Sequence, residues 1–458
     1  MRLHNTFTKK IEEFRPIEKN KVRMYSCGPT VYDYVHIGNF RTFLMADFLR
    51  RTFEYLGYEV KHVKNITDVG HLTREDIEAG EDKMLKAARR EKKSPFDIAR
   101  FYEEAFHRDE IKLNILPAHV FPRATEYIPQ MIEMIKKLIE KKYAYEVKGS
   151  VFYDIEKFEN YGKLSGNTLE NLKTGARLET HPDKKHSYDF ALWLKADPDH
   201  IMQWDSPWSR GYPGWHIECS AMSSSNLGET LDIHSGGEDN VFPHHEDEIA
   251  QSEGASGKKF VNYWIHGRHL MVDGEKMSKS KGNFYSLSEL EKRNMDPLSF
   301  RYLCLTAHFQ SQLNFTWKSL EAGQSAMKKL SEFVISAENN GTEGKIIEKY
   351  DNEFIKALEN NLDTPGAIAL VWEMIRSDEY SREDKRQTLL KFDKVLGFDL
   401  DKSAREDIEI PEKITKLAME REKARTSKDW KRADEIRKEI EKEGFQISDT
   451  KEGQKIKK

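Results

Sequence analysis

The chain has 458 residues, of which 38% are hydrophobic and 33% are charged, so it is long enough for several domains and too large for a small disulfide-stabilised module. No apolar run reaches the ~18 residues that cross a bilayer, and residues 1–21 are charged throughout, so we expect no membrane span, no secretory signal and a cytoplasmic location. The 74 basic and 78 acidic residues nearly balance, at −4, so any surface for nucleic acid must be local.

The first 115 residues alternate between strand and helix patterns. Residues 22–26 and 59–66 form short apolar runs typical of strands, and residues 39–56 between them have helical periodicity. This order is the opening of a βαβ unit.

The residues between this unit and a second α/β segment do not continue the alternation of strand and helix patterns. Residues 157–187 are polar and rich in Gly and Asn punctuation, so we expect mostly loop there. Strand and helix alternation resumes at residue 214 and continues to about 267. We therefore expect residues 115–205 to be an insertion that splits one doubly wound α/β domain. Before the loop, helical patterns cover 95–113 and 124–141, and a β-rich stretch covers 144–154.

After about residue 296 only helical patterns occur, which predicts an appended helical bundle. Residues 411–458 contain two charged helical patterns and a tail that we expect to fray. Residues 421–442 hold nine Lys/Arg and six Asp/Glu, which suits either a solvated helix face or a phosphate-facing surface. The expected bundle helices are 297–308, 316–338, 352–359, 365–376 and 383–394.

Two separated motifs suit the binding of a phosphate chain. Cys27-Gly-Pro-Thr-Val-Tyr leaves the first strand, and His36-Ile-Gly-Asn39 enters the following helix, where backbone N–H groups and the positive helix end favour phosphate. His36 and Asn39 are three residues apart, so both can donate to phosphate oxygens, although a histidine at a helix start is also compatible with a structural role.

The second motif, Lys276-Met-Ser-Lys279-Ser280, follows a hairpin-like stretch at residues 262–274. Its lysines suit either a basic surface loop or a site that places cations on a developing pyrophosphate. The sequence lacks GxxxxGK[ST], so a nucleotide would not be held by a Walker loop.

Four scattered side chains form a possible metal set. The only cysteines are Cys27, Cys219 and Cys304, too few for a disulfide framework. His244 and Glu248 are four residues apart in a helix expected after Pro243, and with Cys27 and Cys219 they offer a tetrahedral Zn²⁺ set. Alternatively, each cysteine is an inert core residue, the role we expect for Cys304. CxxC and HExxH patterns are absent from the sequence, which argues against a zinc ribbon and a metalloprotease.

Together these motifs resemble a known family. His36-Ile-Gly-Asn39 followed by Lys276-Met-Ser-Lys-Ser280 resembles the paired nucleotide signatures of class I aminoacyl-tRNA synthetases. The opening at Cys27, Gly214-Trp-His-Ile-Glu-Cys219 and Phe242-Pro-His-His-Glu246 resemble the cysteinyl-tRNA synthetase family in particular. The first signature ends in Asn39 where many class I members have His, a variant seen in this family.

The resemblance implies both an activity and a domain plan. The activity is ATP-dependent ligation of L-cysteine to tRNA(Cys) through a cysteinyl-adenylate, by a cytoplasmic and monomeric enzyme, with Mg²⁺ as the usual companion of ATP. The domains would be a Rossmann-like catalytic domain (1–114 and 206–295), a connective insertion (115–205), a helical bundle contacting tRNA (296–400) and a small basic helical domain on the anticodon side (401–458).

The resemblance also implies roles for individual residues. His36, Asn39, Lys276 and Lys279 would bind ATP and act in catalysis, while Zn²⁺ held by Cys27, Cys219, His244 and Glu248 would bind the cysteine sulfur. Thr67, Trp215, His234 and Asp239 would line the amino-acid pocket. Trp430 would stack on an unpaired base or pack between helices, and Arg421, Lys423, Arg425, Lys428, Lys431, Arg432, Arg437 and Lys438 would form a phosphate-facing patch.

Two other functions share part of this pattern. A cysteine ligase of thiol-cofactor biosynthesis would couple activated cysteine to an amino sugar, but such enzymes lack an extended helical C-terminus. A catalytically inactive zinc protein that binds RNA could lose His36 or Lys279, and both are present here.

Overall fold

The computed structural model falls into two compact units, Met1–Asp399 and Leu400–Lys458. No helix among the residues it describes is long and apolar enough to cross a bilayer. The described residues are 1–74, 79–175, 183–198, 200–277, 282–337, 344–401, 412–427, 429–443, 445–450 and 453–457.

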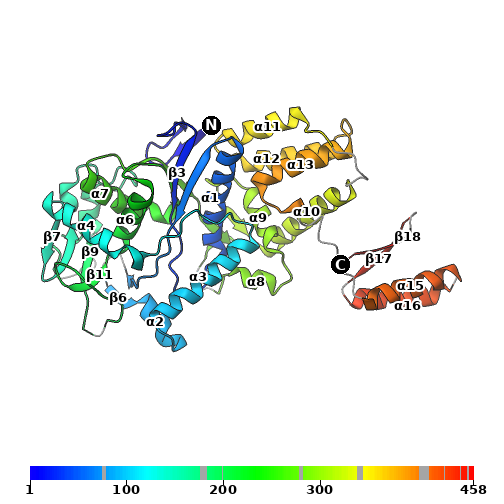
Figure 1. The fold of residues 1–458 in the computed structure, drawn as a ribbon, viewed down its shortest axis with the longest axis horizontal. Coiled ribbons are helices and arrows are strands. Elements are labelled where there is room, and N and C mark those ends of the chain that lie inside the picture. The colour runs from blue at the N-terminus through cyan, green and yellow to red at the C-terminus, as the bar shows by residue number, and fades with distance from the viewer. Residues whose placement is uncertain are drawn as a thin grey trace. The chain divides into compact units, whose positions relative to one another are not determined.

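The centre of the first unit is a parallel four-stranded sheet (Figure 1). Its order is β13-β12-β3-β4, with each pair of neighbours parallel. Strands β3 and β4 precede the long insertion, and β12 and β13 follow it. Residues 209 positions apart, such as Met24 and Ile233, therefore pair where β3 meets β12. Carboxyl ends of these strands therefore share one edge, where ligands bind in open α/β sheets. The bounds are β3 (Lys21–Ser26), β4 (Glu59–Lys64), β12 (Leu231–Gly237) and β13 (Val261–Gly267).

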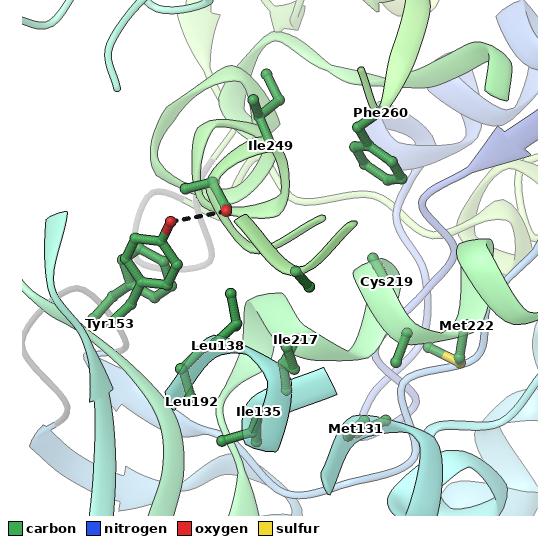
Figure 2. Packing of buried hydrophobic residues seen from close by; sticks show 14 of the residues in the cluster. Met131, Ile135, Leu138, Tyr153, Leu192, Ile217, Cys219, Met222, Ile249 and Phe260 are labelled. Atoms are coloured by element: carbon green, nitrogen blue, oxygen red, sulfur yellow. Dashed lines mark hydrogen bonds between the residues drawn. The ribbon is translucent and has the colours of Figure 1, made fainter. Parts of the chain in front are cut away.

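Helices cover both faces of this sheet, as a doubly wound fold requires. On one face α1 (Ile37–Tyr55) buries Met45, Leu49 and Phe53 against the sheet, in one hydrophobic core. On the other face α4 (Ile128–Glu140), α6 (Trp215–Leu227) and α7 (Glu246–Ser256) share a second core. Figure 2 shows this core, with Cys219 among its apolar neighbours and Tyr153 donating to the Ala250 carbonyl at 2.9 Å. The predicted doubly wound α/β class is confirmed.

The segment between the two halves carries its own antiparallel sheet, of order β10-β11-β9-β8-β7. The sheet continues through Pro213, beyond residue 205 where the sequence pattern places the end of the insertion. Helix α4 packs on α6 and α7, which fastens the segment to the α/β core. The bounds are β7 (Ala144–Val147), β8 (Ser150–Tyr153), β9 (Phe190–Lys195), β10 (Trp204–Asp205) and β11 (Arg210–Pro213).

The predicted helical bundle follows the α/β region. A buried ion pair joins the two, because Asp47 of α1 lies 2.6 Å from Arg301 of α9 and 2.8 Å from Arg51. Arg301 also donates to the backbone carbonyls of Leu113 and Leu396, so each of its three guanidinium nitrogens makes a hydrogen bond. The bundle helices are α9 (Pro297–Leu305), α10 (Trp317–Ser336), α11 (Glu348–Glu359), α12 (Thr364–Arg376) and α13 (Arg382–Leu396).

The second unit contains α15 (Glu412–Thr426) and α16 (Trp430–Lys442), which pack around a small core of Ile414, Ile436 and Ile440. The predicted frayed tail is wrong, because β17 (Gln446–Thr450) and β18 (Gly453–Lys457) pair as an antiparallel hairpin. β17 contains a single apolar residue, Ile447, so its sequence carries no periodic signal for a strand.

The hairpin-like stretch predicted at residues 262–274 is also wrong. Residues 261–267 are the parallel edge strand β13, and the hairpin forms later, between β14 (Leu270–Val272) and β15 (Glu275–Lys276). The remaining elements are β1 (Arg2–Asn5), β2 (Lys10–Glu13), β5 (Leu72–Arg74), β6 (Ala79–Asp82), α2 (Lys83–Glu91), α3 (Pro95–Lys112), α5 (Leu169–Gly175), α8 (Leu287–Glu291), β16 (Leu313–Phe315) and the short helical turns Ala124–Tyr127, Ile155–Lys157, Glu238–Asn240 and Val241–His245.

Candidate active site and metal centre

Four side chains from three distant segments converge at the carboxyl edge of the sheet. The ligand atoms of Cys27, Cys219, His244 and Glu248 all lie within 4.8 Å of one another. Cys219, His244 and Glu248 are buried, and Cys27 is partly exposed. The structure thus brings together the complete set that the sequence suggested for a metal.

Local structure explains how each of the four reaches this place. Cys27 directly follows β3, and Cys219 lies in the second turn of α6, which packs on that side of the sheet. His244 precedes α7, within a π-helical turn that replaces the helix start expected after Pro243. The four-residue spacing still brings His244 Nε2 to 3.1 Å from Glu248 Oε1.

The buried carboxylate of Glu248 is held in its charged form. Burial opposes ionisation, but the neighbouring imidazoles of His234 and His244 outweigh it and lower the pKa of Glu248 to about 2. In contrast, the hydrogen bond to Cys27 and burial raise the pKa of the Cys219 thiol well above its usual value. A divalent cation would reverse the second effect, because metal binding favours thiolates.

The chemistry of these donors fits a zinc ion. Two thiols, one imidazole and one carboxylate are ligands of the types that Zn²⁺ prefers, and four of them complete a tetrahedral shell. Glu248 Oε1 is buried, and His244 Nε2, 3.1 Å away, is not aligned to donate a hydrogen bond to it, so the oxygen has room for a further partner. A cation among the four side chains would supply that partner.

The cluster opens into a cavity of about 300 Å³. Cys27, Trp215 and Asp239 line it, and so do His36 and Asn39 of the first signature. A single cavity therefore joins Cys27 of the metal set to the turn that the sequence predicts to bind phosphate, and its volume suits a small molecule.

The first signature forms the start of α1. His36 is the N-cap residue, and its Nδ1 accepts from the Asn39 backbone N–H at 3.2 Å, while the Asn39 side chain is exposed. The ring of His36 lies 4.7 Å from the ring of Phe284.

The segment that follows the second signature lies beside the first signature. Ile37 donates its backbone N–H to the Tyr285 carbonyl at 2.9 Å, and His36 forms a β-bridge with Ser286. Lys276 is exposed in β15 and is not among the residues that line the cavity. Lys279 and Ser280 lie outside the described residues.

The four residues expected in the amino-acid pocket divide into two pairs. Trp215 and Asp239 line the cavity, and the Trp215 ring lies 4.4 Å from the ring of His244. Thr67 and His234 are buried behind the cavity wall. His234 Nε2 donates to Glu248 Oε2 at 2.9 Å, so it supports a carboxylate of the metal set and is not among the residues that line the cavity.

Several buried residues around the cluster escaped the sequence reasoning. His216 Nδ1 lies 2.9 Å from His244 Nδ1, and its Nε2 lies 3.2 Å from Asp247. His245 Nε2 lies 3.2 Å from Cys27 Sγ. His216 directly follows Trp215, and His245 directly follows His244. This proximity to predicted site residues is the feature of the sequence that points to the two histidines. Lys83, the first residue of α2, also lines the cavity.

The basic face of the second unit is partly as expected. Trp430 is 58% exposed, so it does not pack between two helices. Arg421 is only 2% exposed, and its place in the predicted phosphate-facing patch is therefore wrong. Lys423, Lys431, Arg432 and Lys438 are exposed, Arg425 and Arg437 are partly so, and Lys428 lies outside the described residues.

Two family models match the chain. Residues 13–325 match the class I tRNA synthetase (C) catalytic domain, and residues 407–456 match the cysteinyl-tRNA ligase anticodon binding domain. The chain belongs to the cysteinyl-tRNA ligase family. Members of this family are the cysteinyl-tRNA synthetases that the sequence motifs resemble, so that resemblance is confirmed.

Whole proteins of the cysteinyl-tRNA ligase family align along nearly the entire chain. "Cysteine--tRNA ligase 1" of Burkholderia lata is 44% identical, over 99% of this chain and 96% of that protein. "Cysteine--tRNA ligase" of Treponema denticola is 42% identical, over 98% of each. A solved methionyl-tRNA synthetase of Mycobacterium tuberculosis, in complex with methionyl-adenylate, superposes with a TM-score of 0.58 at 14% identity, over 84% of this chain and 93% of that one. This last likeness shows the shared fold.

Proposed function

We propose that the chain ligates L-cysteine to tRNA(Cys) in two steps, through a cysteinyl-adenylate. The observation that carries the proposal is the single cavity lined by both Cys27 of the metal set and His36 and Asn39 of the first signature. Joining an amino acid to ATP requires the amino-acid site and the phosphate site to be contiguous, because the carboxylate must reach the α-phosphate.

The adenylation step needs no nucleophile from the protein. The cysteine carboxylate attacks the α-phosphate, and pyrophosphate leaves. His36 and Asn39 at the positive end of α1, with Lys276 and Lys279, would donate to the phosphate oxygens as charge spreads over them. Their role is therefore positioning and charge stabilisation.

Zn²⁺ would be held by Cys27, Cys219, His244 and Glu248. When bound, it would bind the thiolate of cysteine. The hydroxyl group of serine does not lose its proton near neutral pH and would bind more weakly, so the metal would select cysteine against serine. Trp215 and Asp239 would enclose the rest of the amino acid in the cavity, while His234 would orient Glu248. Such selection before chemistry makes a separate editing domain unnecessary.

The second step would use the helical C-terminal part. The anticodon domain match at residues 407–456 and exposed Trp430 support tRNA as the acceptor in preference to an amino sugar. The division into a catalytic domain, a connective insertion at 115–205, a tRNA-contacting bundle at 296–400 and an anticodon-side domain from 401 belongs to this proposal. So do a monomeric state and the presence of Mg²⁺ with ATP.

One pair of assays on purified protein tests the proposal. Cysteine-dependent exchange of pyrophosphate into ATP should occur without tRNA, and serine should support it at least about 10³-fold less well. Charging of tRNA(Cys) should follow on addition of the tRNA. Exchange without charging would point to the amino-sugar ligase, and neither reaction would point to an RNA-binding protein without activity. Metal analysis should find one zinc per chain.

A further inference from the structure

Lys83 is a cation at the cavity that belongs neither to the two signatures nor to the metal set. It is the first residue of α2 and is half-buried. Its Nζ lies 5.9 Å from the centre of the Tyr32 ring, and Tyr32 lines the cavity as well. Among the lysines and arginines in the described part of the chain, Lys83 is the one that lines this cavity.

The start of α2 is held in place by buried contacts. Asp82 is 5% exposed and caps the helix, because its Oδ1 accepts from the Leu85 backbone N–H at 2.8 Å. Its other oxygen, Oδ2, lies 3.3 Å from His200 Nε2. The Lys83 backbone N–H donates to the His71 carbonyl at 2.8 Å. The fold therefore fixes the backbone of Lys83 at the edge of the cavity.

The other charged side chains at the cavity favour a cation in this place. Asp33 and Asp239 line the cavity, and Arg90 Nη1 lies 3.8 Å from Asp33 Oδ2 and partly offsets that carboxylate. A phosphate group that enters a cavity with carboxylates in its wall is repelled, and the repulsion is stronger where protein replaces water. Lys83 supplies the opposite charge within the same cavity.

One wall of the cavity follows the chain from the metal set to the first signature. Every residue from Cys27 to His36 except Val31 lines the cavity. Tyr32 lies in the middle of this segment, and Lys83 lies beside it. Cysteine held through Cys27 and a phosphate chain at His36 would meet between the two ends, because the carboxylate must reach the α-phosphate. Lys83 therefore places its charge near the point where the reactants meet.

We propose that Lys83 contacts the α-phosphate, both in ATP and in the cysteinyl-adenylate, and offsets its negative charge. The inference rests on the proposed function, which brings ATP into this cavity. The α-phosphate is charged in ATP, in the transition state and in the adenylate, so Lys83 contributes to binding at each stage. Lys279, in contrast, would act on charge that spreads during the reaction.

Calorimetric titration of the zinc-loaded protein with two stable analogues of the adenylate tests this. Cysteinol adenylate keeps the charged phosphate, whereas the matching sulfamide has an uncharged NH–SO₂–NH group in its place. Lys83→Gln should weaken binding of cysteinol adenylate about 10-fold or more, the size of a lost hydrogen bond to a charged group. It should change the affinity for the sulfamide, and that for free cysteine, less than twofold.

Three further variants separate the charge from general damage to the cavity. Lys83→Arg keeps the charge and should retain most of the preference for the phosphate analogue. Lys83→Met removes the charge but keeps a long side chain, so it should repeat the selective loss and serves if Lys83→Gln does not fold. Lys86→Gln is the matched control, since Lys86 is an exposed lysine of α2 that does not line the cavity. It should leave both affinities unchanged.

Equal weakening of both analogues by Lys83→Gln, or no weakening of either, would overturn the inference. Weaker binding of free cysteine with an unchanged preference for the phosphate analogue would also overturn it, because Lys83 would then contact the amino-acid carboxylate. A wild-type protein that binds neither analogue would instead remove the proposed function together with the inference. Calorimetry keeps these outcomes apart because it does not depend on ligase activity.

Discussion

The two groups of residues that share the cavity are built in opposite ways. The metal set is buried and crowded, with His216, His234 and His245 each within 3.2 Å of one of its members. The signature residues Asn39 and Lys276 are exposed, and His36 is half-buried. One group is fixed by the fold before any ligand arrives, and the other is accessible to solvent.

This difference matches the two tasks. Distinguishing a thiol from a hydroxyl requires donor atoms held at fixed positions, which neighbouring side chains in a packed core provide. A nucleotide is large and highly charged, so a few exposed donors at a helix start can bind it without burial. We therefore expect damage to the first group to affect amino-acid recognition and damage to the second to affect mainly the rate of chemistry.

The largest effect should come from the metal set itself. Cys219→Ser should lower zinc content from one per chain to a small fraction and reduce cysteine-dependent pyrophosphate exchange by about 10³-fold or more, since a buried ligand is lost. Atomic absorption and the exchange assay measure the two quantities. Cys304→Ser, at a buried cysteine in α9 outside the set, should keep both near wild type. A Cys219→Ser protein that is fully loaded and still prefers cysteine would refute the ligand assignment.

Lys279→Ala should affect rate more than binding. We expect the rate constant for adenylate formation to fall about 10²-fold, with the dissociation constant of cysteine changing less than threefold, because the lysine acts on charge that develops in the transition state. Single-turnover kinetics separates the two values. Lys258→Ala, at an exposed lysine paired with Glu229, is the control and should change neither. Equal losses in rate and binding would contradict the division between the two groups.

His216→Phe should have an intermediate effect, confined to the metal. His216 Nδ1 lies within hydrogen-bond distance of His244 Nδ1. Removal of a side chain that orients a metal ligand lowers metal affinity about 10- to 100-fold. Competition with a chelator measures this affinity. His186→Phe, on the exposed face of the insertion, should leave the affinity unchanged. If His216→Phe binds zinc as tightly as the wild type, then His216 packs against the metal set without contributing to its affinity for the metal.

The smallest effect concerns stability away from the cavity. Hydrogen bonds to Glu103 and Glu110 raise the pKa of His107 to about 9, above its ordinary value near 6.5. A raised pKa stabilises the fold below pH 6.5, and this contribution is lost as the pH rises through 9. Urea unfolding from pH 7 to 10 should show a decline in the free energy of unfolding that His107→Gln makes shallower. A slope that the variant leaves unchanged would show that other groups cause it.

Much of the secondary structure could be predicted, because helices such as α1, α3 and α13 carry periodic apolar residues and recognisable caps. Ser94 caps α3 with Pro95 in its first turn, and Ser381 caps α13. Short elements were harder. The apolar residues of 261–267 are compatible with one strand of a hairpin and also with a buried parallel strand. The parallel pairing with β12 shows that the second interpretation is correct.

The sequence by itself determined the ligand types, the two signatures and the family. Thiol, imidazole and carboxylate groups follow directly from the residue types, and the spacing of the motifs follows from their positions in the chain. Only the tertiary structure decided which buried neighbours support them. His234 forms a hydrogen bond with Glu248, Arg421 is buried, and the Glu218 carboxylate accepts a hydrogen bond from the Thr67 hydroxyl. The physical reason is that β3 precedes α6 and α7 by about 200 residues, and contacts between distant segments depend on packing that local patterns do not encode.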